Sequence, residues 1–350
     1  MTTLDFSALN ASVTTQDIRE HRAAGGPAPT SLIPTIIAAV VILVVGGLMV
    51  SFVMSAVSSV VTDSGPSPAI LIVVAIAAAA VVALFFITRR ALSIRLVRMS
   101  RFAAANGFAY SVNAGVPDYP GAIFGIGSAR SIPERLSRAT KPTVDVGDLR
   151  YTTGSGKNRK VHNWGYIAIR LDRMLPQMVL DATSNNFLGT NLPVTFSRDQ
   201  KLSLEGDFDR YFTLYCPREY EADALYVFTP DLMARLVDEA ATLDVEIVDD
   251  WMFLYSESPF DLAEPATLAR IFRIVDTVGT RTLDRTERYA DSRVGDSTPA
   301  SSPLTARMSH NVVAGPGRRL QRGLPIAGVL LVAAIAVIWI ANFAPLFSRL

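Results

Sequence analysis

Three long apolar runs constrain this chain more than any other feature of its sequence. Residues 32–61, 69–88 and 325–347 contain no charged residue. A helix needs about 20 apolar residues to cross a bilayer, so each run is long enough. Half of all residues are hydrophobic and only 19% are charged. The sequence therefore predicts three transmembrane helices, the first two joined as a hairpin.

Arginines next to two of these runs predict an orientation in the membrane. The second run is followed by Arg89, Arg90, Arg95, Arg98 and Arg101, and the third is preceded by Arg318, Arg319 and Arg322. Positively charged residues mark the cytoplasmic side of a spanning helix. We therefore expect a multi-pass protein of the plasma membrane, with a cytoplasmic N-terminus and main domain and an extracytoplasmic C-terminus.

The remaining sequence divides into segments of different character, which predict the domain organisation. The expected order is a polar cytoplasmic tail (1–31), the transmembrane hairpin (32–61 and 69–88), a basic amphipathic juxtamembrane helix (89–105), an α+β cytoplasmic domain (106–289), a flexible linker (290–324) and the third transmembrane helix (325–347). The predicted fold class is an α+β domain, with antiparallel strands packed against two or three helices, anchored by three transmembrane helices.

Within the domain, alternating apolar residues predict strands and longer periodic stretches predict helices. The expected strands include 143–153, 161–172, 177–182, 245–248 and 251–255. Thr229, Pro230 and Asp231 form a helix start, because Thr caps the first turn, Pro suits the first helical position and an acid favours the first turn. This helix is expected to run to about Leu243, and others are expected over 219–227 and 264–278.

Two basic clusters are candidate contacts for an anionic lipid or a phosphate. The first consists of Arg90, Arg95, Arg98 and Arg101 on the juxtamembrane helix; the second consists of Lys157, Arg159 and Lys160 in a glycine-rich turn. The alternatives are that the arginines only set the topology and that the turn is an ordinary basic hairpin tip. A nucleotide-binding P-loop is excluded for the turn, because its spacing of glycines and the Ser or Thr after the lysine are absent.

Small residues on the first apolar run predict a helix–helix contact. Gly47, Ser51, Ser55 and Ser59 recur every four residues. Small side chains on one face let two helices approach closely in lipid. The contact is expected either within the hairpin or between copies of the chain, as a homo-oligomer.

The sequence predicts no catalytic, cofactor or metal site. The three histidines lie far apart, and the chain has neither the Cys nor the His spacing of a zinc site. Cys216, His162 and Asp181 supply the residue types for nucleophilic catalysis, but Cys216 ends an apolar strand and suits a buried position. The near-neutral net charge of +1 gives no indication of nucleic-acid binding.

Several sequence blocks resemble an uncharacterised family of bacterial integral membrane proteins that carry a cytoplasmic domain of unknown function. The blocks include YTTGSGKNR at 151–159, LEGDFDRYFTLYCP at 204–217 and YEADALYVFTPDLM at 220–233. The resemblance implies a membrane-tethered domain and no known activity, cofactor or catalytic residue.

These observations favour a protein-interaction or scaffolding module at the inner membrane face. The expected partners are the lipid bilayer and an unidentified protein. The alternatives are a membrane-associated, hydrolase-like enzyme and a sensor of anionic lipid or another ligand.

Overall fold

The computed structural model describes residues 4–27, individual residues between Val40 and Val57, and residues 68–186, 190–204, 206–293 and 311–323. The chain forms two compact units. One comprises Asp5–Ala105, and the other comprises Met1–Leu4 with Asn106–Leu350.

The N-terminal unit is helical, with α1 (Ser7–Asn10), α2 (Thr15–Ala23) and the long α4 (Pro68–Ala105). A capping box starts α2: the Asp17 amide donates to the Thr14 hydroxyl, and the Thr14 amide donates to the Asp17 carboxylate. The last turns of α4 pack against this N-terminal region, where the rings of Phe6 and Phe102 stack 5.6 Å apart. The apolar face of α4 is therefore covered at its C-terminal end.

Among the described residues, no helix is long and apolar enough to cross a membrane. This finding contradicts the predicted three-helix anchor, and with it the predicted multi-pass location in the plasma membrane, with a cytoplasmic domain and an extracytoplasmic C-terminus. Residues 69–88 do not form a separate helix, because they are the first half of α4, which continues through five arginines to Ala105. The run 325–347 and most of 32–61 lie outside the described residues.

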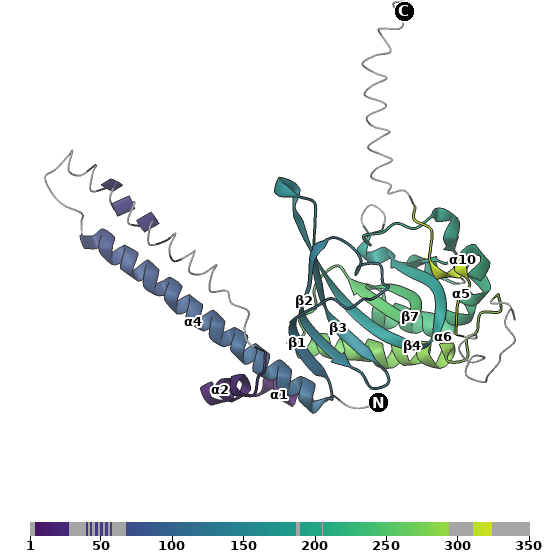
Figure 1. Cartoon of the computed structure of the whole chain (residues 1–350), viewed down its shortest axis with the longest axis horizontal. Coiled ribbons are helices and arrows are strands. Elements are labelled where there is room, and N and C mark those ends of the chain that lie inside the picture. The colour runs from purple at the N-terminus through teal and green to yellow at the C-terminus, as the bar shows by residue number, and fades with distance from the viewer. Residues whose placement is uncertain are drawn as a thin grey trace, which may run out of the picture. The chain divides into compact units, whose positions relative to one another are not determined.

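The second unit is built on a seven-stranded antiparallel sheet (Figure 1). The strands are β1 (Ala109–Ala114), β2 (Ser128–Arg138), β3 (Val144–Thr153), β4 (Lys160–Ala182), β5 (Lys201–Leu202), β6 (Phe212–Tyr215) and β7 (Asp244–Ser256). The predicted fold class, an α+β domain anchored by three transmembrane helices, is therefore wrong. The structure shows an antiparallel sheet with helices, and no membrane anchor among the described residues.

Strand β4 organises the sheet, because three other strands pair with it. Its first half pairs with β3, its last four residues pair with β6, and β7 follows it through both halves. The order of the remaining path is β1-β2-β3-β4-β6-β5. The register between β4 and β7 shifts between Arg170 and Met178, which marks a bulge in the middle of the sheet.

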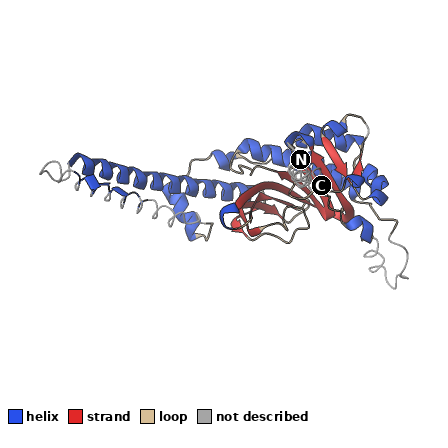
Figure 2. Ribbon diagram, turned by 90° about the horizontal axis from the view of Figure 1, so that it is seen from above, coloured by secondary structure: helices blue, strands red, loops and turns tan. Residues whose placement is uncertain are grey.

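Helices accompany the sheet in the second unit (Figure 2). They are α5 (Glu221–Val227), α6 (Pro230–Ala240), α7 (Pro265–Ile274), α8 (Thr280–Thr286) and the short α10 (Gly315–Arg318). A π-helical turn, η6 (Val275–Gly279), joins α7 to α8. Gly279 allows this helix to lie close to β4, since a Cβ atom there would be 2.6 Å from Cδ1 of Ile169.

Aromatic side chains form much of the core next to the sheet. Phe124, Tyr166, Phe253 and Tyr255 are almost completely buried in one cluster, and Tyr119 packs against it. The Tyr166 and Tyr119 hydroxyls both donate to Asp145, at 3.1 and 2.6 Å, and Arg135 forms an ion pair with the same carboxylate at 2.6 Å. The core therefore contains a buried charge that is fully hydrogen-bonded.

Residues 311–323, which we call the strap, lie within the predicted flexible linker but pack against the sheet. The Met174 amide, in the bulge of β4, donates to the Asn311 side chain at 2.8 Å. The Leu320 amide donates to the Gln177 side chain at 2.8 Å, and Leu320 is buried. The strap therefore supplies hydrogen-bond partners where the sheet is irregular.

An ion pair between the strap and β7 stabilises a strained residue. Asp249 has a φ of 53°, a left-handed conformation that is uncommon for residues other than glycine. The Arg319 guanidinium binds both carboxylate oxygens of Asp249, at 2.9 and 2.8 Å. This two-point contact holds the Asp249 side chain in place where β7 departs from regular pairing.

We expect Leu320→Ala to lower the free energy of unfolding by about 2–4 kcal/mol, because it removes a buried side chain and leaves a cavity. Leu225→Ala serves as the matched control, since Leu225 is 53% exposed and should change stability by less than about 1 kcal/mol. Urea denaturation of the full chain measures both. Equal effects of the two variants would show that the strap does not belong to the core.

Candidate functional site

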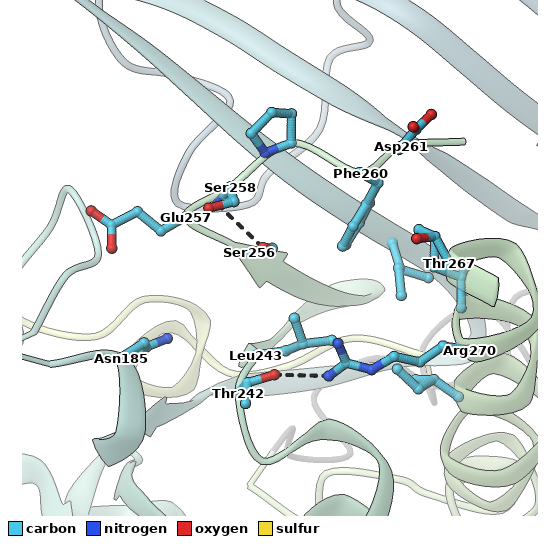
Figure 3. A pocket seen from close by; sticks show the side chains of 14 residues that line it. Asn185, Thr242, Leu243, Ser256, Glu257, Ser258, Phe260, Asp261, Thr267 and Arg270 are labelled. Atoms are coloured by element: carbon cyan, nitrogen blue, oxygen red, sulfur yellow. Dashed lines mark hydrogen bonds between the residues drawn. The ribbon is translucent and has the colours of Figure 1, made fainter. Parts of the chain in front are cut away.

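A cavity of about 390 Å³ opens at the end of β7. Its walls come from four stretches of the chain: Ile167 of β4, the turn that holds Asn185, the link between α6 and β7, and the segment from Ser256 to Ile274 (Figure 3). Ligand sites in proteins commonly have volumes of about 300–1,000 Å³. The cavity is therefore large enough for a small ligand or for one or two side chains of a partner.

The floor of the cavity is apolar and its rim is polar. Leu243, Ile271 and Ile274 are buried side chains of the floor, and Ile167 of β4 joins them. The polar rim consists of Asn185, Thr242, Ser256, Glu257, Ser258, Asp261, Thr267 and Arg270. Such a site can bind an apolar group and orient it through hydrogen bonds at the edge.

The loop after β7 is fixed by hydrogen bonds to the sheet and to itself. The Phe260 amide donates to the Asp148 carboxylate at 2.7 Å, and the Ser258 amide donates to the Ser256 hydroxyl at 3.2 Å. Gly165 makes room for the Phe260 ring, since a Cβ atom there would lie 2.9 Å from it. The aromatic wall of the cavity is therefore held in a defined position.

Arg270 is the only cation among the residues that line the cavity. It lies on α7, and one of its terminal nitrogens donates to the Thr242 hydroxyl at 2.8 Å (Figure 3). A guanidinium carries five N–H donors in a fixed plane. Arg270 is exposed and can therefore offer further donors to a carboxylate in the cavity.

Behind the rim lie two buried carboxylates, Asp244 and Asp181, and Asn185 contacts the first of them. The Asn185 amide nitrogen lies 3.3 Å from each oxygen of Asp244, and the Ala182 amide donates to Asp244 at 2.8 Å. Asp181 accepts hydrogen bonds from Asn186 and Thr190. The buried carbonyl oxygen of Asn185 has no hydrogen-bond partner in the described part of the chain.

Burial disfavours the charged form of both carboxylates. It raises the pKa of Asp244 to about 7, and the nearby charge of Asp181 acts in the same direction. Burial also raises the pKa of Asp181, against the effect of its two hydrogen bonds. Asp244 does not line the cavity but contacts Asn185, which does.

The structure places the predicted arginines of the juxtamembrane helix on the second half of α4. Arg98 donates to the Ala11 carbonyl at 3.0 Å, and Arg101 forms an ion pair with Asp17 at 2.5 Å. Arg95 also has an interaction partner, and Arg90 is exposed. Three of the four predicted lipid contacts therefore have a partner in the protein, two of them, Arg98 and Arg101, within the N-terminal unit.

The other predicted residues also lie away from the cavity. Lys157, Arg159 and Lys160 are exposed at the turn between β3 and β4. Gly47 and Ser51 are partly buried helical residues, whereas Ser55 and Ser59 lie outside the described residues. The predicted helix–helix contact is therefore described only in part.

The residue types considered for nucleophilic catalysis are engaged in separate contacts. His162 shares a hydrogen bond of 2.8 Å with Thr153 and stacks on Tyr151. Cys216 is buried directly after the end of β6, and burial raises its pKa to about 12. In the described part of the chain, no three His, Cys, Asp or Glu side chains are grouped so that they could hold a metal ion.

Sequence reasoning did not find the cavity residues, because they belong to no motif. Arg270 looks like any exposed helical arginine, and Asn185 sits in a short polar turn after a strand. The segment Ser256–Asp261 is rich in Ser, Pro and acidic residues, a composition typical of a loop after a strand. Its convergence with Asn185 and Thr242 depends on pairing between β4 and β7.

Comparisons with known proteins give no family for this chain. No protein-family model and no curated protein matches it. Among solved structures, the chain is similar to the crystal structure of the mycobacterial trehalose monomycolate transport factor A, TtfA, with 12% sequence identity and a TM-score of 0.34. The match covers 54% of this chain and 92% of that chain. A similarity this low supports no conclusion about fold or function.

The raised pKa of Asp244 predicts a pH-dependent stability. Between about pH 4 and 7 the folded chain keeps a proton that the unfolded chain has lost, so the free energy of unfolding falls as the pH rises. Asp244→Asn cannot titrate. We expect its stability relative to wild type to improve by about 2–4 kcal/mol from pH 4 to pH 7.5.

Urea denaturation at several pH values measures this difference. Asp238→Asn, at an exposed position on α6, is the control, and its stability should run parallel to wild type across the range. Parallel curves for Asp244→Asn and wild type would contradict the raised pKa.

Burial of Cys216 predicts a slow thiol reaction. In the folded chain at pH 8, a thiol with a pKa of about 12 is almost entirely protonated, and the thiolate is the reactive form. We expect reaction with a disulfide reagent to be at least about a hundredfold slower in the native chain than in urea. Comparable rates under both conditions would show that Cys216 is accessible.

Proposed function

We propose that the second unit is a protein-interaction module and that the cavity at the end of β7 holds a short segment of a partner protein. The observation that carries the proposal is the combination of an apolar floor with hydrogen-bonding side chains from three separate stretches of the chain. A peptide segment carries apolar side chains, backbone N–H and C=O groups and charges in one molecule, so it can satisfy all of these groups together.

The rim favours a peptide that contains an acidic group beside an apolar side chain. Arg270 can pair with a carboxylate of the peptide, because its guanidinium keeps further N–H donors beside the one that binds Thr242. Glu257 and Asp261 also lie on the rim and would repel a purely anionic ligand. A peptide with both charged and neutral parts fits this mixed rim better than a simple anion does.

The contacts of Asp244 support a positioning role. The carboxylate binds Asn185 and the Ala182 amide, and it is completely buried. A general acid or base has to reach the proton that it transfers. Asp244 therefore holds in place Asn185, a residue that lines the cavity.

Selection of phage-displayed random heptapeptides on the immobilised full-length chain tests the proposal. We expect enrichment of peptides with an acidic residue next to an apolar residue. For a synthesised peptide, fluorescence anisotropy should show binding at least about tenfold weaker for Arg270→Ala, because a charged hydrogen bond is lost.

Arg273→Ala is the matched control, since Arg273 is exposed on the same helix but does not line the cavity. Its affinity should stay within about twofold of wild type. Failure to enrich any peptide, or equal losses for Arg270→Ala and Arg273→Ala, would contradict binding at the cavity.

A further inference from the structure

One end of the sheet is basic and free of acidic residues. The segments 119–133 and 149–163 contain no Asp or Glu, although the chain as a whole has almost equal numbers of acids and bases. The basic end consists of Arg130, Arg150, Lys157, Arg159 and Lys160. All five are exposed.

Strand register places these cations at one end of three neighbouring strands, with Arg150 and Lys160 on opposite faces of the sheet because they lie three residues apart in register. Arg150 of β3 pairs with Ser131 of β2 on one side and with Asn163 of β4 on the other. Lys160 pairs with Thr153 across the hairpin. Neighbouring strands are about 4.8 Å apart, so β2 and β4 are separated by about 10 Å. This distance is close to the Debye length at physiological salt, so the charges act on a ligand together.

Glycines fix the shape of the hairpin tip that carries three of the cations. Gly154 and Gly156 have φ values of 73° and 55°, which side chains rarely allow. A Cβ atom on Gly154 would lie 2.3 Å from the Asn158 carbonyl oxygen. The Asn158 amide donates to the Ser155 carbonyl at 3.1 Å, so the turn is closed. The cations therefore stand on a defined turn.

The same end of the sheet presents an open strand edge. Strand β1 pairs with β2 only as far as Ala114 and Ile132. In the described part of the chain, Ser128–Ser131 of β2 pairs with β3 alone. Ser128, Ala129 and Arg130 are exposed. The register of β2 shifts between Ser128 and Ser131, and Ala129 has a φ of 51°, so this edge is bulged. Its backbone groups that face away from β3 are available to an added strand.

We propose that the basic end binds an acidic, extended segment of a partner protein, which adds to the open edge of β2 and pairs its carboxylates with the cations. The open edge decides between the anionic partners: a peptide can use both the backbone groups and the cations, whereas a lipid head group or a nucleic acid can use only the cations. This surface shares no residue with the cavity, so the two proposals can fail independently.

Fluorescence anisotropy of the full-length chain with a labelled eight-residue peptide of alternating Glu and Val tests the proposal. Alternation places all carboxylates on one face of an added strand. We expect Lys157→Gln/Arg159→Gln/Lys160→Gln to weaken binding at least about tenfold, and added salt to weaken wild-type binding. The control Lys201→Gln/Arg210→Gln/Arg288→Gln removes three exposed cations elsewhere and should bind within about twofold of wild type.

A second peptide of the same sequence and charge, with N-methyl groups on both the valines and the glutamates, tests the added strand. It cannot donate backbone hydrogen bonds at those positions, so we expect it to bind at least about fivefold more weakly. Equal binding of the two peptides would overturn strand addition. If the two triple variants lost the same affinity for the peptide, the loss would come from the change in net charge alone, and the proposed site would be wrong.

Single-stranded DNA and vesicles of phosphatidylglycerol with phosphatidylcholine complete the comparison. If either binds through the hairpin-tip cations while the Glu-Val peptide does not, the proposed acidic protein partner is wrong.

Discussion

The second unit depends on the hydrogen bonding of one carboxylate, that of Glu246. Glu246 has no exposed surface, and transfer of an unpaired charge to such a site costs far more than the net stability of a domain. Three donors surround it: the Tyr255 hydroxyl at 2.7 Å, the Gln177 amide at 2.6 Å and the Ala122 amide at 2.7 Å. Burial still raises its pKa. The donors come from β7, β4 and the loop before β2, so the position of Glu246 fixes these three segments relative to one another.

Elements that depend on local signals were predictable from the sequence. The capping Thr229 and Pro230 predicted the start of α6, and the structure confirms it, although the helix ends at Ala240 instead of about Leu243. Helix α7 begins at Pro265, close to the predicted start, but a π-helical turn and α8 extend it to Thr286. That extension depends on Gly279, which acquires its role only when Ile169 of β4 lies against it.

Elements that depend on distant partners were not predictable. The sequence suggested separate strands at 161–172 and 177–182, and at 245–248 and 251–255, because charged residues interrupt the apolar alternation. Each pair is one strand in the structure, β4 and β7. The interruptions are stabilised by long-range contacts: Asp249 by Arg319 of the strap, and the bulge of β4 by Asn311. The cavity could not be predicted from the sequence for the same reason, because its walls meet only through the pairing of β4 with β7.

The strap has a consequence for the order in which the protein can be completed during synthesis. The side-chain carbonyl of Gln177 accepts its hydrogen bond from the Leu320 amide, which lies 143 residues later in the chain. Contacts of such long sequence separation form slowly, and they cannot form on the ribosome before their second partner has left the exit tunnel. A nascent chain that stops short of the strap leaves the buried Gln177–Glu246 network incomplete.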